Sequence, residues 1–382
     1  MTRVLLVSHY YPPHVGGVEN VVHQEAIRLV AAGAEVTVLT SGPHSSTSVE
    51  EGVTVVRVGS WNGFEPHGIP FPVPWPTLYT RARRWARWAD VVHVHDSFYM
   101  TSWAAWFGAA TTGTPLVATQ HVAMSEHPVK AVELIQRLVY AVIGKRVIRR
   151  ARTVFTINER GADFARGLGA SPDVVRHLPN GVDTELFQPG NAEEKAKARA
   201  EFGLPEDGVL VLFVGRLLAK KGLDILLEAR DPETYQLVFV GPGEPEQTRQ
   251  FEGLADVHYL GSRTPAELAR IYQACDVFAL PTANEGFPLT VQEAMSSGLP
   301  VLTTDDPAYA SYNLDRDRMA LTGREAAEVG DRLREIALDA GLRTAMGGYA
   351  RAYAERHFAW GEHVAALLER YRSAVGPSPG RG

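Results

Sequence analysis

The chain has 382 residues, of which 45% are hydrophobic and 21% are charged, and its formal net charge is −6. This length predicts two domains of roughly 150 to 200 residues in a soluble, globular protein. The negative net charge argues against a general nucleic-acid-binding protein, because proteins of that class carry a surplus of Lys and Arg to neutralise phosphates.

Cysteine content and the N-terminus indicate the cell compartment. Cys275 is the single cysteine, so no intramolecular disulfide can form, and we interpret it as a small core residue rather than a nucleophile. The opening MTRVLLVSHYYPPHVGG lacks the apolar region and cleavage site of a secretory signal. No window approaches the roughly 20 apolar residues that span a bilayer. These features predict a cytoplasmic protein.

The first half of the chain alternates short apolar runs with helix-period segments. Residues 3–8 predict a buried strand, which a Gly-rich loop and a helix from about Val18 to Gly33 follow. Strands separated by helices are typical of a mostly parallel sheet. Further strands are expected at 35–40, 53–58, 89–95, 115–121 and 152–158.

The strand series restarts after residues 178–207, whose Pro, Gly and charge content marks a boundary. Strands are expected at 209–215, 235–241, 257–261, 275–281 and 299–304. The resulting domain prediction is an N-terminal domain at 1–187, a linker at 188–207, a C-terminal domain at 208–355, a helix at 356–375 returning to the N-terminal domain, and a disordered tail at 376–382. Because parallel sheets bind ligands at the carboxyl ends of their strands, we expect the site in the cleft between two α/β domains.

Two loops that follow strands carry residues suited to phosphate. Gly16 and Gly17 precede a helix whose free N–H groups could hold a phosphate, although a plain strand-to-helix turn explains them equally. Arg216 and Lys221 follow the strand at 209–215. The planar guanidinium of an arginine and the compact ammonium of a lysine together suit a diphosphate. For Lys221 and its neighbour Lys220, a solvated pair is the alternative.

The segment NEGFPLTVQEAMSSGLPVL places two glutamates eight positions apart. Pro288 suits the first turn of a helix, and Gly298 suits its end. Glu285 then lies at a strand end and could accept hydrogen bonds from sugar hydroxyls. Glu293 lies within the helix and could bind a ribose diol, or it is an ordinary carboxylate on the helix surface.

Other chemistries find less support in the sequence. VGPGEPE at 240–246 lacks the third glycine of a dinucleotide fingerprint, and neither a Walker A motif nor a Gly-x-Ser-x-Gly elbow occurs. His93 and His95 share one strand face next to Asp96, but no convincing third ligand is evident. We therefore predict no metal site.

In order along the chain, GGVEN, LPNGVDTELFQP, GRLLAKKGLDILLEA and EGFPLTVQEAMSSGLPVL resemble segments of the retaining glycosyltransferases of family 4. The resemblance covers nearly the whole chain and implies the GT-B fold, in which two Rossmann-like parallel-sheet domains face each other across a deep cleft. One departure is TTDDPAYASYN at 303–313, where many relatives have a Gly-Gly turn and a Glu.

The resemblance implies a nucleotide-diphosphate sugar as co-substrate, with no cofactor and no metal. It carries catalytic roles to Arg216, Lys221, Glu285 and His121, although His121 could instead be satisfied by its own backbone. Donor binding is expected at Gly16, Gly17, Arg216, Lys221, Arg263, Glu285, Gly286, Phe287, Pro288, Leu289 and Glu293, and acceptor-side contacts at His14, Glu19, Asn20 and Asp96.

The expected reaction is transfer of a hexosyl unit from a UDP-sugar or GDP-mannose to a hydroxyl of a glycan, glycolipid or secondary metabolite. The family implies a front-face path, and double displacement at Glu285 competes with it. A nucleotide-sugar epimerase or phosphorylase and a non-catalytic nucleotide-sugar-binding protein are the alternatives.

Residues 81–88 and 130–152 interleave Arg and Lys with apolar residues. This pattern suits contact with anionic lipid while sugar is delivered to a lipid-linked acceptor, and it equally suits helices whose apolar face is core. Peripheral membrane association is therefore one of two interpretations.

Overall fold

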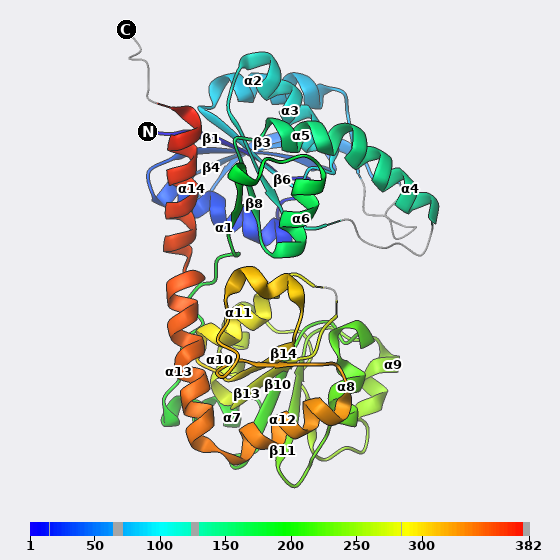
Figure 1. The fold of residues 1–382 in the computed structure, drawn as a ribbon, viewed down its shortest axis with the longest axis vertical. Coiled ribbons are helices and arrows are strands. Elements are labelled where there is room, and N and C mark those ends of the chain that lie inside the picture. Colours follow the sequence, from blue (N-terminus) through cyan, green and yellow to red (C-terminus); the bar gives the residue numbers. More distant parts are fainter. Residues whose placement is uncertain (15, 64–71, 124–129, 284, 377–382) are drawn as a thin grey trace. The chain divides into compact units, whose positions relative to one another are not determined.

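The computed structural model describes residues 1–14, 16–63, 72–123, 130–283 and 285–376. The chain divides into unit 1, made of Met1–Pro179 and His363–Gly382, and unit 2, made of Asn180–Glu362 (Figure 1). The segment 188–207, expected as a linker, falls in unit 2 and contains the helix α7 (Ala192–Glu201). Residues 377–382 of the expected tail lie outside the described residues.

Unit 1 is built on a sheet with the strand order β3-β4-β2-β1-β6-β7-β8-β9, and β5 pairs with β4. Only β3 and β5 pair antiparallel with β4, while the other described pairs are parallel. The predicted strands of the first half are confirmed, whereas β3, β5 and β9 were not predicted. The bounds are β1 (Arg3–Val7), β2 (Glu35–Gly42), β3 (Ser46–Glu50), β4 (Val53–Trp61), β5 (Val73–Pro74), β6 (Val91–His95), β7 (Leu116–Gln120), β8 (Thr153–Thr156) and β9 (Val175–His177).

Helices cover both faces of this sheet, because alternate strand residues point to opposite faces. In β1, Leu5 and Val7 pack with residues of α2 and α3, whereas Val4 and Leu6 pack with residues of α1 and α14. From His363 on, α14 belongs to unit 1. The bounds are α1 (Gly17–Ala31), α2 (Thr77–Trp88), α3 (Met100–Thr112), α4 (Lys130–Val139), the π-helical turn η2 (Tyr140–Gly144), α5 (Lys145–Arg150), α6 (Glu159–Gly167), η3 (Pro172–Val174) and α14 (Trp360–Val375).

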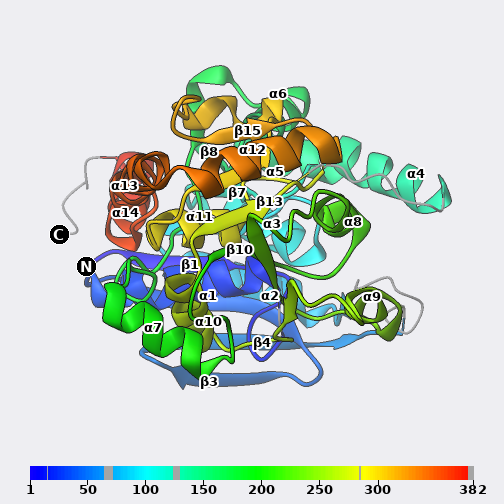
Figure 2. The same cartoon turned by 90° about the horizontal axis from the view of Figure 1, so that it is seen from below.

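Unit 2 has a parallel sheet with the order β12-β11-β10-β13-β14-β15. Figure 2 shows β10 and β13 with α12 on one side and α7 and α10 on the other. Cys275 is buried here, as predicted. The strands are β10 (Val209–Val214), β11 (Tyr235–Val240), β12 (Val257–Tyr259), β13 (Val277–Leu280), β14 (Val301–Thr304) and β15 (Ala320–Thr322), of which only β15 was not predicted. The helices are η4 (Ala219–Lys221), α8 (Leu223–Glu228), α9 (Pro245–Thr248), η5 (Arg249–Phe251), α10 (Pro265–Ala274), α11 (Leu289–Ser296), η6 (Pro307–Tyr312), α12 (Ala326–Leu338) and α13 (Ala340–His357), besides α7.

Candidate functional site

The centre of the unit 2 sheet brings two of the predicted loops together. β10 pairs with β11 on one side and with β13 on the other, so the strand order reverses between β10 and β13. Arg216 and Lys221 follow β10, and Glu285 follows β13. Ligands of open α/β sheets bind at this kind of switch point, outside the carboxyl ends of the strands.

Lys221 and Glu285 form an ion pair at this point. The Lys221 Nζ lies 2.6 Å from Oε1 and 2.7 Å from Oε2 of Glu285, and both side chains are mostly buried. Arg216 is exposed and makes no ion pair with a described residue. The site therefore has one cation that is already neutralised and one that is open to an anionic ligand.

A glycine allows the two loops to approach each other. Gly222 has a φ of +88°, and a Cβ atom there would lie 2.6 Å from the carbonyl oxygen of Pro281, just after β13. A side chain at this position would be strained and would push the loops apart. Gly222 thereby holds Lys221 within reach of Glu285.

Glu293 lies in α11, half-buried rather than on the exposed helix surface. Its Oε2 accepts a hydrogen bond of 3.0 Å from the Tyr272 hydroxyl. Its carboxyl is enclosed closely enough that burial raises the pKa to about 7, although the Tyr272 hydrogen bond acts in the opposite direction. A carboxyl in this state can accept a further polar partner.

The start of α11 differs in one detail from the prediction. Pro288 does not occupy the first helical turn but has an extended backbone at the N-cap, and Leu289 begins the helix. The Phe287 side chain is buried and stacks on Tyr312 with ring centroids 4.3 Å apart. The Phe287 side chain is thus engaged in packing, and the first N–H groups of α11 have no partner within the helix.

The segment 303–313, which departs from the family pattern, forms the end of β14 and the short helix η6. Tyr309 and Tyr312 in η6 are buried and pack against Phe287. Aromatic packing therefore supports the Glu285 to Leu289 loop from this side.

Arg263, expected near the donor, is engaged within its own segment. Its Nε donates to the Leu260 carbonyl at 2.9 Å, its Nη1 lies 3.2 Å from Glu267, and its guanidinium lies 5.5 Å from the Phe202 ring centroid. It lies after β12, which is separated from β10 by β11.

The N-terminus of α1 in unit 1 holds a carboxylate of the protein itself. Glu19 is buried in the first turn, and its Oε1 lies 3.0 Å from Nδ1 of His14. A Cβ atom on Gly16 would lie 2.1 Å from the Glu19 Oε2, whereas Gly17 has open space around it. The structure thus brings together His14, Glu19 and Gly16, while Asn20 is exposed. A phosphate at Gly16 would have to replace the Glu19 carboxylate.

Asp96 organises the loop that carries His121. Asp96 follows β6 with a φ of +60°, which is uncommon for a residue other than glycine. Its Oδ1 accepts hydrogen bonds from the backbone N–H of His121 at 2.8 Å and of Val122 at 3.2 Å. Burial raises the pKa of Asp96, and His121 acts against that rise. Asp96 is therefore buried and holds the backbone of the His121 loop in place.

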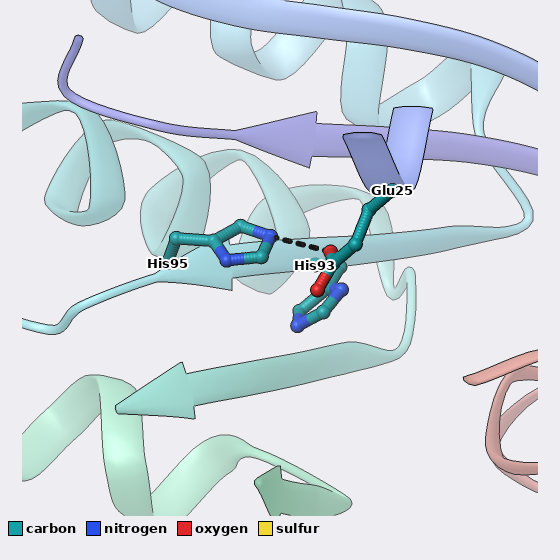
Figure 3. A group of neighbouring side chains, drawn as sticks. All are labelled: Glu25, His93 and His95. Carbon is teal, nitrogen blue, oxygen red and sulfur yellow. Dashed lines mark ion pairs between the residues drawn. The ribbon is translucent and has the colours of Figure 1, made fainter. Parts of the chain in front are cut away.

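A network of buried polar side chains lies between the sheet of unit 1 and helices α1 and α14. His93 and His95 lie on one face of β6, as the strand pattern predicted, and Glu25 of α1 meets them there (Figure 3). Oε2 of Glu25 lies 3.3 Å from Nε2 of His95, and Oε1 lies 2.9 Å from Nε2 of His363. His95 continues to His121, with Nδ1 of His95 3.0 Å from Nε2 of His121.

Ligand-type atoms of Glu25, His93 and His95 lie within 4.8 Å of one another, a spacing that could hold a metal ion. Both ring nitrogens of His93 already have hydroxyl partners, Tyr371 at 2.6 Å and Thr119 at 2.8 Å. We therefore interpret the group as a hydrogen-bond network.

Charge in this network is concentrated on Glu25. Burial lowers the pKa of His93 to about 3 and that of His95 well below its ordinary value, so both rings are neutral. Burial alone would raise the pKa of Glu25, but His95 and His363 hold it below its ordinary value. Glu25 is thus a buried carboxylate with imidazole partners on both oxygens.

Sequence reasoning did not predict Glu25, His363 or Tyr371. Glu25 lies in the inward stripe of α1, three residues after Val22 and four before Leu29. A glutamate in an apolar stripe was the available signal, because buried carboxyls need partners. The partner histidine lies 338 residues away, and no local pattern indicates it.

Both halves of the chain match models of glycosyltransferase families. The model of the family described as Glycosyltransferase Family 4 matches residues 15–186, and that described as Glycosyl transferases group 1 matches residues 194–353. A D-inositol 3-phosphate glycosyltransferase of Xylanimonas cellulosilytica is 32% identical over 99% of this chain and 98% of its own. That of Acidothermus cellulolyticus is 31% identical over 94% of this chain and 86% of its own.

Solved structures share the fold at lower identity. HepE of Anabaena in complex with UDP has a TM-score of 0.77 at 18% identity and covers 98% of this chain and 100% of its own. Sucrose-phosphate synthase of Thermosynechococcus elongatus has a TM-score of 0.75 at 20% identity and covers 98% and 99%.

Proposed function

Since the chain belongs to the group 1 and family 4 glycosyltransferases, a family of GT-B enzymes, we propose that it transfers a hexosyl unit from a nucleoside diphosphate sugar to a hydroxyl acceptor with retention of configuration. A donor with UDP is supported by the fold neighbour HepE, whose structures contain UDP and UDP-glucose. GDP-mannose is the alternative donor.

One observation carries this proposal. The exposed Arg216 and the pair of Lys221 with Glu285 gather at the strand-order reversal of unit 2. An anionic diphosphate there would attract the Lys221 ammonium, and Glu285 would be freed to accept hydrogen bonds from the sugar hydroxyls. Donor binding would thus exchange an internal ion pair for ligand contacts.

In the proposed reaction, the bond between the sugar C1 and the diphosphate oxygen breaks while the acceptor oxygen bonds to C1 on the same face. The acceptor proton passes to an oxygen of the leaving diphosphate, so that no base of the protein is needed. Negative charge grows on the diphosphate, where Arg216 and Lys221 provide positive potential. We propose that these two cations serve in place of a metal ion and that no cofactor takes part.

Double displacement would require Glu285 as the nucleophile. Both of its carboxylate oxygens lie within 2.7 Å of the Lys221 ammonium. With donor bound, the proposed hydrogen bonds from the sugar hydroxyls to Glu285 favour the role of a positioning group over that of a nucleophile.

The names of the relatives support a phosphorylated polyol as the first acceptor to test. The test combines purified protein with UDP-glucose, UDP-N-acetylglucosamine or GDP-mannose and inositol 3-phosphate. Formation of a glycosylated product with release of the nucleoside diphosphate is the expected result. Isomerised donor without transfer would indicate an epimerase, and heat stabilisation by donor without turnover would indicate a binding protein.

We further propose that α4, and not α2, contacts membranes. Leu134, Ile135 and Leu138 in α4 are each more than half exposed, whereas Leu78, Ala82 and Ala86 of α2 are buried in the core. No helix in the described part of the chain is long and apolar enough to cross a bilayer. Exposed apolar residues next to basic ones favour a surface contact with anionic lipid.

Sedimentation with phosphatidylcholine vesicles, with and without phosphatidylglycerol, tests this contact at low salt. Binding that requires the anionic lipid and is lost in Leu134→Ser with Leu138→Ser is expected. Absence of binding by the unaltered chain would remove the membrane proposal and leave the transferase proposal intact.

A further inference from the structure

Two buried side chains, Glu25 and His95, connect the interior of unit 1 to His121, the histidine to which the family resemblance gives a catalytic role. Glu25 contacts His95, and His95 contacts His121. We infer that Glu25 and His95 are positioning residues that fix His121 in the tautomer with its proton on Nε2, so that Nδ1 is an acceptor for a substrate hydroxyl. Only the substrate part of this inference rests on the proposed function.

The inference starts at His363, whose partners limit where protons can lie. Nδ1 of His363 lies 2.8 Å from the carbonyl oxygen of Pro179, which can only accept, so this nitrogen carries a proton. Nε2 of His363 and Oε1 of Glu25 are 2.9 Å apart and share one further proton. Whether that proton resides on the ring or on Oε1, Oε2 of Glu25 remains an acceptor.

The next step concerns the contact between Glu25 and His95. Oε2 of Glu25 and Nε2 of His95 are 3.3 Å apart, a contact by distance without hydrogen-bond geometry, and neither buried atom has a hydrogen-bond partner in the described part of the chain. If Nε2 lacked a proton, two acceptors would face each other without water, which is unfavourable in a buried site. Nε2 of His95 therefore carries the proton.

The state of His121 follows from that of His95. Burial keeps His95 neutral, so a proton on Nε2 leaves its Nδ1 without one. This Nδ1 lies 3.0 Å from Nε2 of His121, which must donate to it. Neutral His121 then has an unprotonated Nδ1. Because the Asp96 carboxylate also holds the backbone N–H of His121, both the ring and its loop are fixed by buried groups.

A fixed acceptor would act on specificity. Nδ1 of His121 can accept a hydrogen bond from a sugar hydroxyl, but it has no proton to donate to an ether or carbonyl oxygen. We expect the enzyme to discriminate against substrates in which the contacted hydroxyl is removed or methylated, because the acceptor would be left without its hydrogen bond.

Ring-¹⁵N labelling of histidine tests the tautomers directly, because two-bond ¹H–¹⁵N spectra distinguish protonated from unprotonated ring nitrogens. Signals of His95 and His121 are assigned with His95→Phe and His121→Asn. In the unaltered protein, both rings are expected to carry the proton on Nε2. A proton on Nδ1 of His121 would overturn the inference without any variant or activity measurement.

Two substitutions of Glu25 make a matched pair. Glu25→Leu removes the acceptor, and mixed tautomers of His95 and His121 are expected together with a fall in kcat of about tenfold. Glu25→Gln can turn its carbonyl oxygen to His95 and its NH₂ group to a neutral His363, so the tautomers and kcat should be retained. Unchanged tautomers in Glu25→Leu would overturn the inference.

The activity result separates this inference from the proposed function. If the tautomers change in Glu25→Leu while kcat and the donor KM do not, the positioning of His121 is supported and its contact with substrate is overturned. If Glu25→Leu does not fold, His95→Phe tests the same link, since it removes the acceptor of the His121 proton while keeping an aromatic ring of similar size.

Discussion

Glu25 in unit 1 and Glu293 in unit 2 are both glutamates on a helix that follows a strand, but their surroundings differ in charge. Imidazole rings contact both oxygens of Glu25 and hold its pKa below the ordinary value. Glu293 has the neutral hydroxyl of Tyr272 as its partner, and burial raises its pKa to about 7. The first carboxyl is paired with imidazole rings within the protein, whereas the second can still gain a charged hydrogen bond from a ligand.

The comparison predicts that ligand-dependent chemistry is concentrated in unit 2, where the largest effects are expected. Arg216→Ala, Lys221→Ala and Glu285→Ala should each lower kcat/KM by about two orders of magnitude or more, because each removes a preorganised contact with charge that develops in the reaction. Steady-state kinetics with the donor found in the screen measures this. The exposed neighbour Lys220→Ala is the control, and near-normal transfer by the three variants would contradict the site.

In unit 1, we expect a large loss of stability when a partner of the buried Glu25 carboxylate is removed. His363→Ala leaves a buried carboxylate with one partner fewer and should lower the free energy of unfolding by about 3 kcal/mol. Urea denaturation measures the change. Glu369→Ala, at an exposed position of the same helix, should change it by less than about 0.5 kcal/mol. Equal effects of the two variants would show that the pair contributes little.

Glu293 should give the opposite dependence on pH from an ordinary carboxylate. Its folded pKa of about 7 exceeds its ordinary value of 4.5, so the unfolded state loses its proton first and stability falls as the pH rises from about 4.5 to 7. Glu293→Gln should lack this fall, so between pH 4 and pH 8 it should gain about 3 kcal/mol of stability relative to the unaltered protein. Urea denaturation across this range measures it. Parallel curves for the two proteins would refute the raised pKa.

The smallest effect concerns donor affinity. If ribose hydroxyls donate to an ionised Glu293, nucleoside diphosphate should bind up to about tenfold more weakly at pH 6 than at pH 8. Calorimetric titration measures this dependence. Since the nucleotide phosphate also ionises near pH 6, Glu293→Gln supplies the baseline, and an identical pH dependence in the variant would exclude a ribose contact by the carboxylate.

Much of the fold could be predicted because its strands are continuous apolar runs between helices. The strands that were not predicted are short or polar. β3 reads STSVE and lies at the sheet edge with largely exposed side chains, and β9 and β15 have only three residues each. Apolar periodicity gives no signal for such strands, because a strand that is polar or only three residues long shows no apolar alternation.

The candidate site divides in a similar way. Lys221 and Glu285 could be predicted to meet because each follows a strand and parallel strands end at one edge. The side-chain partners of these residues could not be predicted from the sequence. The ion pair between them, the Glu19 carboxylate at Gly16 and the partners of Glu25 depend on side-chain packing between distant segments.

The assignment of α14 to unit 1 has a consequence for biosynthesis. His363, Leu367 and Tyr371 complete the α1 face of a domain whose first strand is made at the opposite end of the chain. While the ribosome is still translating unit 2, this face lacks the cover that α14 provides, and the Glu25 carboxylate lacks one of its two partners. A fragment ending near residue 179 should therefore aggregate or bind chaperones, and adding a peptide of residues 360–376 should rescue its solubility.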